Sequence, residues 1–375
     1  MAMALLTKTR TDREWMERTL ELARQGEALT SPNPLVGAVL VRDGEEIARA
    51  WHTYDGVKHA EVLALEEAGE AARGATLYTN LEPCSHQGRT GPCVEAIMAA
   101  GVRRVVAAMP DPNPKVNGQG LARLRAAGID TFVGVLIQES QQLNEPFASW
   151  IRTGRPLVTL KAALTLDAKI APAAPTPPGE RWITSEESRA RVQRLRHQSD
   201  AVLTGIGTVL ADDPRLSDRT ECPRRRRLLR VVLDAGLRLP LESELVRSTQ
   251  NDLVVFCGED VWMGKRAKLE ERGVEVIELK EAGGQLSLRA VLDRLGKREI
   301  TSVLLEAGAR LNAAAVESGL VDKVWLFYAP KFFGEGGLPL LAGEVSLPAL
   351  SDFRLHRFGP DFAVEGYLRD VYRDH

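Results

Sequence analysis

The sequence predicts an α/β fold divided between two domains. Helical and strand-like segments alternate through both halves of the chain, which is typical of sheets covered by helices. At 375 residues the chain exceeds what one ordinary core holds, so two domains are expected. The segment TGRP at 153–156 separates two alternating series. We therefore expect domains over 1–152 and 153–375.

The first domain is expected to form three α/β/α layers. Thr11 and Glu14 make a capping-box pattern that begins a helix. Arg42-Asp43-Gly44 is a hairpin turn signal, and Pro92 suits the first turn of a later helix. The expected elements are helices over 11–25, 59–72, 92–100, 119–127 and 139–151, and strands over 35–41, 46–51, 75–81, 103–109 and 130–136.

The second domain begins a new alternating series. The segment APAAPTPPGE at 171–180 is too rich in proline for regular structure, so we expect a loop. The basic run from Arg224 to Arg227 is expected to be a solvated loop before a strand. Strands are expected over 157–164, 200–205, 228–234, 252–257, 274–279, 301–306 and 322–330.

The composition is that of a soluble globular protein, with 44% hydrophobic and 27% charged residues. The net charge of 49 − 51 = −2 gives no global attraction to nucleic acid or anionic membranes, so neither is expected as a partner. No apolar run approaches the roughly 18 residues that span a bilayer, and the N-terminal apolar patch is too short for a secretory signal. Four cysteines are too few for a disulfide scaffold, so we expect the reducing cytoplasm.

His59, Cys84 and Cys93 predict a catalytic zinc site. One nitrogen and two thiolates would leave a fourth position for water, whose pKa then falls towards neutrality. Glu61 is expected to shuttle protons without ligating, because His-x-Glu followed by Pro-Cys and a second Cys is the arrangement of zinc deaminases. Two residues apart on a regular helix do not share a face, so spacing alone does not establish the pairing. His59 at the helix entrance could still direct both side chains inwards.

Other interpretations of the same residues remain open. The cysteines are separated by the eight residues SHQGRTGP, and His86 in that loop is a rival ligand, although its position favours a residue that faces the substrate. A structural zinc site would close with four ligands. A polynucleotide deaminase would favour a basic groove, which the near-neutral charge argues against.

Ordered blocks of sequence carry a resemblance over nearly the whole chain. In the first half they are SPNPLVGAVLV (31–41), HAEVLAL (59–65), EPCSHQGRTGPCVEAI (82–97) and DPNPKVNGQG (111–120). In the second half they are KAALTLDAKI (161–170), WITS (182–185), TGIGTVLADDPRL (204–216) and LLEAGARLN (304–312). These blocks resemble the bacterial bifunctional deaminase–reductase family of riboflavin biosynthesis. The resemblance implies a cytidine-deaminase-like first domain and a second domain similar to dihydrofolate reductase.

In the first domain, the resemblance implies hydrolytic removal of the 2-amino group of 2,5-diamino-6-(5-phosphoribosylamino)pyrimidin-4(3H)-one. His59, Cys84 and Cys93 would ligate Zn²⁺. Glu61 would move protons between water, ring nitrogen and the departing amine. The substrate pocket would be lined by Asn33, His52 and the 85–90 loop. Asn33 could equally just hold the Asn-Pro turn.

The second domain carries no convincing dinucleotide fingerprint of its own. The fragment Gly205-Ile206-Gly207-Thr208 alone favours a structural turn. LLEAGARLN predicts a buried strand ending at Glu306 and a helix opening near Ala309, where free N–H groups could receive phosphate.

The resemblance implies that this domain uses NADPH to reduce the ribosyl C1 of the deaminated product to a ribityl chain. Arg196 and Arg219 suit a phosphate, because guanidinium binds it in bidentate fashion, and Lys161 would orient or protonate the substrate. The implied NADPH contacts are Ala163, Trp182, Thr208, Asp212, Gly308, Ala309, Arg310, Leu311, Asn312, Ala313 and Ala314. The implied substrate contacts are Lys161, Glu180, Arg196, Leu216, Arg219 and Glu306.

Three positions of the second domain depart from the family pattern. Ala168 and Ala307 stand where glycine is usual, and Glu180 stands where a small hydroxyl residue is usual. Because a carboxylate repels a phosphorylated substrate, Glu180 is expected to point away or to lie in a rearranged loop. An alternative function is a deaminase whose C-terminal domain has lost reduction. The family's reductase domains commonly associate, so a homo-oligomer, dimer or tetramer, is expected.

Overall fold

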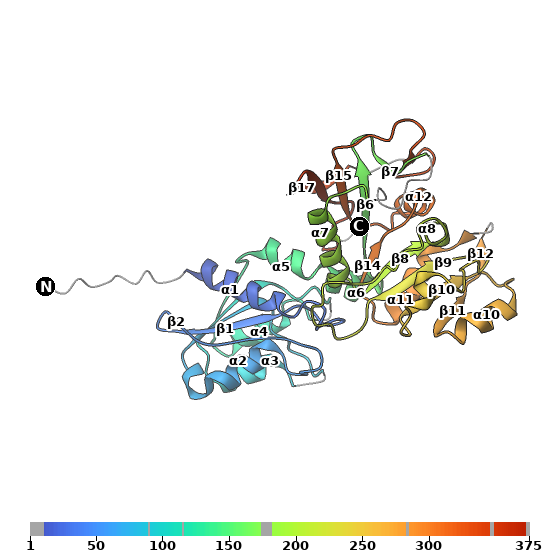
Figure 1. Ribbon diagram of the computed structural model, residues 1–375. Helices are drawn as coiled ribbons and strands as arrows, with labels where there is room; N and C mark the ends of the chain where they lie inside the picture. Colours follow the sequence, from blue (N-terminus) through green and yellow to red (C-terminus); the bar gives the residue numbers. More distant parts are fainter. Residues whose placement is uncertain are drawn as a thin grey trace. The chain divides into compact units, whose positions relative to one another are not determined.

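The computed structural model describes residues 11–88, 91–114, 116–173, 182–282, 285–345 and 349–372. The chain divides into two compact units, Met1–Arg152 and Thr153–His375, each with its own main sheet (Figure 1). Helices pack on both sheets, so the α/β class expected from the sequence is confirmed.

The first unit contains a five-stranded sheet with the order β2-β1-β3-β4-β5. β1 (Gly37–Arg42) pairs antiparallel with β2 (Glu45–Trp51) through the expected hairpin and with β3 (Thr76–Leu81) on its other side. β4 (Arg104–Met109) and β5 (Asp130–Val133) continue the sheet in parallel. β1 and β4 are buried almost throughout, as expected for strands covered on both faces.

Helices on the two faces of this sheet give the three layers. α1 (Asp12–Arg24) and α5 (Ile137–Leu143) pack on one face. α2 (Ala60–Ala68), α3 (Cys93–Ala99) and α4 (Gln119–Ala126) lie on the other (Figure 1). α1 begins with the capping box that the sequence predicts.

The helix expected over 139–151 is instead two helices, α5 and α6 (Glu145–Thr153), which meet at Asn144. The side chain of Asn144 accepts the Leu35 N–H at 2.8 Å through Oδ1 and donates to the Leu35 carbonyl at 3.0 Å through Nδ2. Asparagine side chains offer such local alternatives to continued helix, which the apolar periodicity does not reveal. The helix expected over 59–72 likewise ends early, at Gly69, whose φ of 53° and ψ of −132° are not helical, and a 3₁₀ turn follows.

The second unit contains a nine-stranded sheet with the order β11-β10-β9-β8-β14-β6-β15-β18-β17. The strands expected from the sequence form its parallel part. They are β6 (Leu157–Thr165), β8 (Ala201–Gly205), β9 (Leu229–Leu233), β10 (Leu253–Cys257), β11 (Val274–Glu278), β14 (Ser302–Leu305) and β15 (Lys323–Ala329).

The sequence analysis missed the hairpin of β17 (Ser351–Phe358) and β18 (Asp361–Tyr367) at one edge of this sheet. β17 is exposed along most of its length, so it carries charges instead of an apolar run. The described residues also include two small pairings, of β7 (Lys169–Ala171) with β16 (Leu338–Pro339) and of β12 (Glu281–Ala282) with β13 (Gln285–Leu286).

Alternate residues of the buried strands divide the second core into two layers. In β8, Leu203 faces one cluster and Val202 the other. The first cluster includes α11 (Leu288–Lys297) and α12 (Ala309–Glu317), and the second includes α8 (Ile206–Asp212) and α9 (Glu244–Arg247). The remaining helices are α7 (Glu186–Gln198) and α10 (Met263–Glu270).

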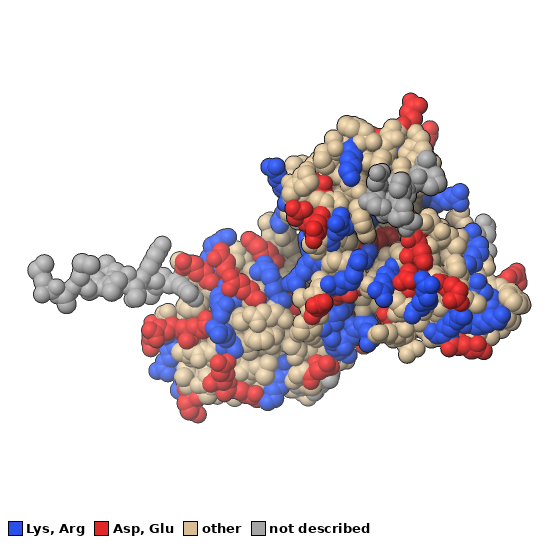
Figure 2. All heavy atoms as spheres, in the orientation of Figure 1, with Lys and Arg blue, Asp and Glu red and all other residues tan. Residues whose placement is uncertain are grey.

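The charged surface has one feature that corrects the sequence analysis. Figure 2 shows acidic and basic side chains interspersed on the visible face. Arg224, however, is no solvated charge: it donates to the carbonyls of Arg196, His197 and Ser199, at 3.2, 2.8 and 2.7 Å, at the carboxyl end of α7. Among the residues described, no helix has the length and apolar character needed to cross a bilayer.

Candidate functional site

The start of α2 resolves how His59 and Glu61 can face the same point. His59 is the N-cap residue, with extended backbone at φ −74° and ψ 156°, and α2 begins at Ala60. The spacing of two residues is therefore not a spacing along a regular helix. The N-cap geometry lets both side chains turn towards the site.

Cys84 and Cys93 meet where the loop after β3 enters α3. Cys93 is the first helical residue, and its N–H donates to the Sγ of Cys84 at 3.3 Å. The Val94 N–H donates to the Cys84 carbonyl at 3.2 Å. Because a helix N-terminus and its N–H groups favour negative charge, the sulfur of Cys84 is well placed to act as a thiolate. The hydrogen bond to Cys84, together with burial, raises the pKa of the Cys93 thiol.

The three candidate ligands have the geometry of a zinc donor set. His59 Nδ1 lies 3.1 Å from Cys93 Sγ and 3.4 Å from Cys84 Sγ, and all three ligand atoms lie within 4.8 Å of one another. Zinc bonds at tetrahedral angles separate nitrogen and sulfur ligands by roughly 3.6 Å. Within the described parts of the chain, these residues form the only cluster of three or more His, Cys, Asp or Glu side chains that could hold a metal ion.

The electrostatics of this cluster favour a bound cation. The hydrogen bond from Cys93 lowers the pKa of the Cys84 thiol to about 4, and the bond to Cys84 raises the pKa of the His59 imidazole to about 9. Without a metal, the site thus balances thiolate charge with a proton on the imidazole. A divalent cation that displaces this proton and the proton of the Cys93 thiol supplies the same balance with two thiolates, so the residues fit zinc.

Glu61 lies beside the ligands with 4% of its surface exposed. Burial raises the pKa of its carboxyl group, while the imidazole of His59 opposes that shift. A carboxyl group with a raised pKa is better able to donate as well as accept a proton near neutral pH.

Asn33 and His52 also lie next to this cluster. Asn33 Nδ2 is 2.9 Å from His52 Nε2, and His52 Nδ1 is 2.9 Å from the Lys58 carbonyl oxygen. A carbonyl only accepts, so Nδ1 carries the imidazole proton and Nε2 accepts from Asn33. The rings of His52 and His59 meet edge to face with centroids 5.4 Å apart. Asn33 therefore contacts the site's neighbours through its side chain as well as holding a turn.

The sequence analysis missed Glu82, which organises the loop beside Cys84. Its buried carboxylate accepts four backbone N–H groups, from Asp111 (3.1 Å), Gly118 (2.8 Å), Gly120 (2.9 Å) and Leu121 (3.2 Å). A Cβ at Gly120 would lie 2.0 Å from the Pro83 carbonyl oxygen, so that position requires glycine. The only signal in the sequence was a carboxylate at the end of an apolar strand, directly before Pro-Cys.

The second unit holds a buried ionic cluster between the carboxyl end of β14 and the middle of β6. Arg196 binds Glu306 through two nitrogens, at 2.6 and 3.0 Å, and Lys161 Nζ lies 3.2 Å from Glu306 Oε2. Burial alone would raise the pKa of Glu306, but the charges of Arg196 and Lys161 hold it at about 2. The structure thus brings together three of the predicted substrate residues.

Arg219 is exposed nearby. Its pKa is lowered by partial burial and then by repulsion from Arg196 and Arg215. Arg219 forms no ion pair with another described residue, whereas Arg196 pairs with Glu306 and Arg215 pairs with Glu244. A cation without an ion-pair partner beside other arginines favours an anion such as phosphate.

Two helix N-termini lie side by side at the ends of the neighbouring strands β8 and β14. Gly205 and Gly308 are the N-caps of α8 and α12, and neither has a side-chain cap. A Cβ at Gly308 would lie 3.7 Å from Thr208 Oγ1, and one at Gly205 would lie 3.5 Å from Leu311 Cδ2. N–H groups at such ends can receive the phosphates of a dinucleotide.

The other predicted cofactor residues surround these turns in different ways. Asn312 is fully buried and donates to the carbonyls of Ala307 and Leu340, at 3.1 and 3.2 Å, so it supports the turn. Ala309 and Ala313 are buried, whereas Arg310, Ala314 and Asp212 are exposed. Ala163 is half-buried on β6, and Trp182 is exposed, with the Arg189 guanidinium 5.0 Å from its ring centroid.

The remaining predicted positions are Leu216 and Glu180, and two further positions, Ala168 and Ala307, depart from the family pattern. The side chain of Leu216 packs in the core, so only its backbone can reach a ligand. Glu180 lies outside the described residues. Ala168 adopts a left-handed φ of 57°, a conformation that glycine tolerates better, whereas no positive φ occurs at Ala307. Ala307 therefore fits its turn without backbone strain.

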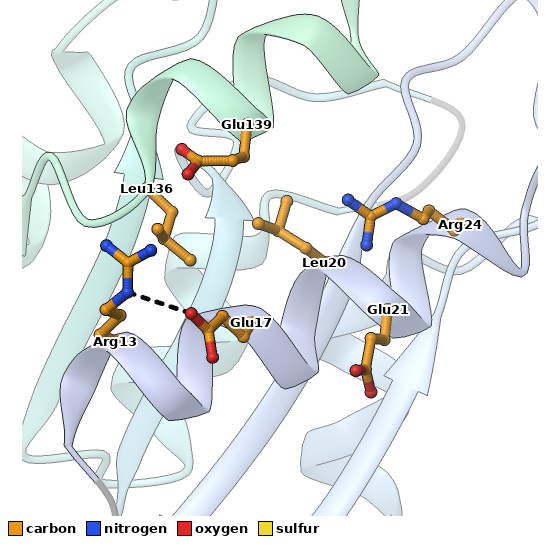
Figure 3. A pocket seen from close by; sticks show the side chains of 7 residues that line it. All are labelled: Arg13, Glu17, Leu20, Glu21, Arg24, Leu136 and Glu139. Carbon is orange, nitrogen blue, oxygen red and sulfur yellow. Dashed lines mark hydrogen bonds and ion pairs between the residues drawn. The ribbon is translucent and has the colours of Figure 1, made fainter. Parts of the chain in front are cut away.

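A pocket of about 260 Å³ lies in the first unit, between α1 and the start of α5 (Figure 3). Arg13 and Glu17 form an ion pair at its edge. Its lining residues are Arg13, Glu17, Leu20, Glu21, Arg24, Leu136 and Glu139. None of them belongs to the predicted sites.

Comparisons with known proteins identify both halves of the chain. The family model of the RibD C-terminal domain matches residues 156–364, and that of the cytidine and deoxycytidylate deaminase zinc-binding region matches residues 9–109. The riboflavin biosynthesis protein RibD of Escherichia coli (strain K12) is 42% identical over 365 residues, 94% of this chain and 98% of its own length. The chain belongs to the RibD family. RibD of Aquifex aeolicus (strain VF5) is 40% identical and covers 91% of this chain and 92% of its own.

Solved RibD structures share the whole architecture. Acinetobacter baumannii RibD, form 1, matches with a TM-score of 0.81 and 37% identity, over 95% of this chain and 98% of that one. A Thermotoga maritima diaminohydroxyphosphoribosylaminopyrimidine deaminase/5-amino-6-(5-phosphoribosylamino)uracil reductase matches with a TM-score of 0.78 and 34% identity, with the same coverage. This chain is thus a bifunctional enzyme of riboflavin biosynthesis with a zinc-binding deaminase domain and an NADPH-dependent reductase domain, which confirms the resemblance.

Proposed function

We propose that this chain performs two consecutive reactions on one phosphorylated pyrimidine. Water first replaces the 2-amino group of 2,5-diamino-6-(5-phosphoribosylamino)pyrimidin-4(3H)-one, releasing ammonia and 5-amino-6-(5-phosphoribosylamino)uracil. NADPH then reduces the ribosyl group to the ribityl chain. The observation that carries the proposal is the cluster of His59, Cys84 and Cys93 beside buried Glu61, in a chain that also has a RibD C-terminal domain.

In the deaminase, His59, Cys84 and Cys93 would hold zinc, and Glu61 moves the protons. Zinc, when bound, supplies a Lewis acid that makes water nucleophilic near neutral pH. Glu61 accepts a proton as water adds to ring carbon C2 and passes it to the adjacent ring nitrogen. It then carries the second water proton to the amine, which leaves as ammonia while the C2 carbonyl forms.

Neighbouring polar groups orient the pyrimidine in this proposal. Asn33 and His52 form one wall, because their hydrogen bond fixes the direction of both side chains. His86 is exposed on the loop between the cysteines, which supports a role towards substrate instead of metal. The described part of that loop, 85–88, completes the pocket.

In the reductase, Lys161 and the arginines act on the substrate. NADPH, when bound, supplies a hydride for ribosyl C1. Lys161, held against Glu306, delivers the proton that the ring oxygen takes as the C1–O bond breaks. Arg196 and Arg219 bind the phosphate, and the backbone of Leu216 borders it. Ala163, Trp182, Thr208, Asp212 and the turn 308–314 would contact the cofactor, and Glu180 would contact the substrate.

We also propose that the enzyme works in the cytoplasm as a homo-oligomer, a dimer or a tetramer. All four cysteines are free thiols, as a reducing compartment favours. The association of reductase domains rests on the family resemblance alone.

A single assay tests both activities. Purified protein receives the diaminopyrimidinone nucleotide and NADPH, and ammonia release and NADPH oxidation are followed separately. Both signals are expected, with oxidation lagging behind ammonia. Ammonia without oxidation would favour the alternative in which the C-terminal domain has lost reduction.

The Glu61→Gln variant tests the assignment of the acid–base group. It should retain about one zinc per chain, lose deamination by at least about 100-fold, and still reduce deaminated substrate. Glu66→Gln is the matched control, because Glu66 lies on the same helix but is exposed and paired with Lys58. Zinc loss in Glu61→Gln, or unchanged deamination, would contradict the assignment.

A further inference from the structure

The loop that carries Arg219 is fastened to α7 at three successive residues. Arg196 donates to the Ser217 carbonyl at 3.1 Å, and the Arg219 N–H donates to Gln193 Oε1 at 3.0 Å. Between them, His197 Nδ1 lies 2.9 Å from Asp218 Oδ2. The loop therefore follows the last turns of α7, which carry the arginine bound to Glu306.

Asp218 is the centre of this attachment. Its Oδ1 accepts the Thr220 N–H at 3.0 Å and the Thr220 hydroxyl at 2.8 Å, and its Oδ2 accepts His197 and Arg224 at 2.9 and 3.0 Å. Its side chain is 8% exposed. Burial opposes ionisation, but these hydrogen bonds hold the pKa of Asp218 at about 2. Asp218 is thus a carboxylate with both oxygens hydrogen-bonded. Hydrogen bonds are directional, so they fix the orientation of the loop more closely than apolar packing would.

Arg224 extends the attachment to the end of α7. It donates to Asp218 and also to the carbonyls of Arg196, His197 and Ser199. Asp218 and Arg224 together therefore fix both the carboxyl end of α7 and the loop that follows β8 and α8. Neither residue contacts Glu306 or Lys161 directly.

We propose that Asp218 is a positioning residue of the reductase. Its carboxylate locks the loop 217–220 to the end of α7, so that Arg196 and Arg219 present their guanidinium groups together to the phosphate of the substrate. The proposal rests on the proposed function of these two arginines. Asp218 is the group that sets the spacing of Arg196 and Arg219 in this proposal. His197 and Arg224 then serve to hold the Asp218 carboxylate in place.

The Asp218→Asn variant tests the proposal in the full-length enzyme. Asparagine has the same shape as aspartate, but its Nδ2 cannot accept a hydrogen bond. In the place of Oδ2 it would therefore face the Arg224 N–H donor without bonding to it. The KM for deaminated nucleotide should rise about tenfold, while the KM for NADPH and the deaminase activity stay unchanged. Where this variant does not fold, Thr220→Val removes one donor to the same carboxylate and should raise that KM about threefold.

Asp322→Asn is the matched control. Asp322 is also a buried carboxylate, but it accepts the Val158 N–H at 2.8 Å and pairs with Arg369 at the amino ends of β6 and β15. It should lower the thermal stability without changing the KM for the nucleotide. An equal rise of KM in both variants would show a merely structural effect and overturn the proposal.

A double-mutant cycle with Arg219→Ala separates the positioning role of Asp218 from the phosphate contact of Arg219. If Asp218 acts by placing Arg219, most of the effect of Asp218→Asn should vanish in the Arg219→Ala background. Full additivity, or an unchanged KM in Asp218→Asn, overturns the positioning role while Arg219 keeps its assignment. An unchanged KM in Arg219→Ala refutes the proposed phosphate contact itself, and the positioning role with it.

Discussion

Replacing Glu82 by glutamine should unfasten the loop beside the zinc ligands. The carboxylate accepts two N–H groups on each oxygen, from Asp111 and Gly118 on Oε2 and from Gly120 and Leu121 on Oε1. Glutamine retains one accepting oxygen. Its amide NH2 replaces the other oxygen and cannot accept from the two N–H groups that were bound there. With roughly 1.5–3 kcal/mol per hydrogen bond to a charged group, two lost bonds cost about 3–6 kcal/mol. Because the loop can relax towards water, we expect the lower end, about 3 kcal/mol.

This effect is measured by urea unfolding of the full-length protein. The residual deaminase and reductase activities are recorded in parallel at each urea concentration, and each gives an unfolding midpoint for its own domain. The deaminase midpoint should fall strongly and zinc should be lost more readily to a chelator, because Cys84 lies two residues beyond Glu82. The reductase midpoint should not change. Glu95→Gln is the control, since Glu95 forms an exposed pair with Arg123 in the same region, worth at most about 1 kcal/mol. A Glu82→Gln deaminase midpoint no lower than that of the control would refute the reasoning.

Two further predictions concern the second unit. Ala168→Gly should stabilise it by roughly 0.5–1 kcal/mol, because glycine relieves the left-handed φ of 57° at some cost in chain entropy; a lowered Tm would contradict this. Glu306 has a folded pKa of about 2 against an ordinary value of 4.5, so its stabilising contribution is fully present above pH 4.5 and is lost as the pH falls towards 2. Urea unfolding across this range should show a steeper loss of stability in the parent enzyme than in Glu306→Gln, and equal slopes would exclude the effect.

The sequence was informative where a pattern is local. Apolar runs located the parallel strands, and the ligand triad was visible because two of its members flank helix starts and the third follows Pro83. The hairpin of β17 and β18 was missed because an exposed edge strand carries no apolar run. Glu82 was missed for a different reason: its partners lie 29 to 39 residues away along the chain. A pattern of nearby residues therefore could not have predicted these hydrogen bonds.

Glu82 and Asp218 solve the same physical problem in different units. Each is a buried carboxylate that accepts four hydrogen bonds, and each stands within two residues of a side chain assigned to a ligand, Cys84 or Arg219. A loop held by apolar contacts can slide, whereas four directed bonds to one rigid group fix its position and orientation. Burying such a charge is unfavourable unless every acceptor is used. Its presence beside each site is therefore better explained by the need for placement than by stability alone, and this is why we expect replacement of either residue to change binding at its own site more than at the other.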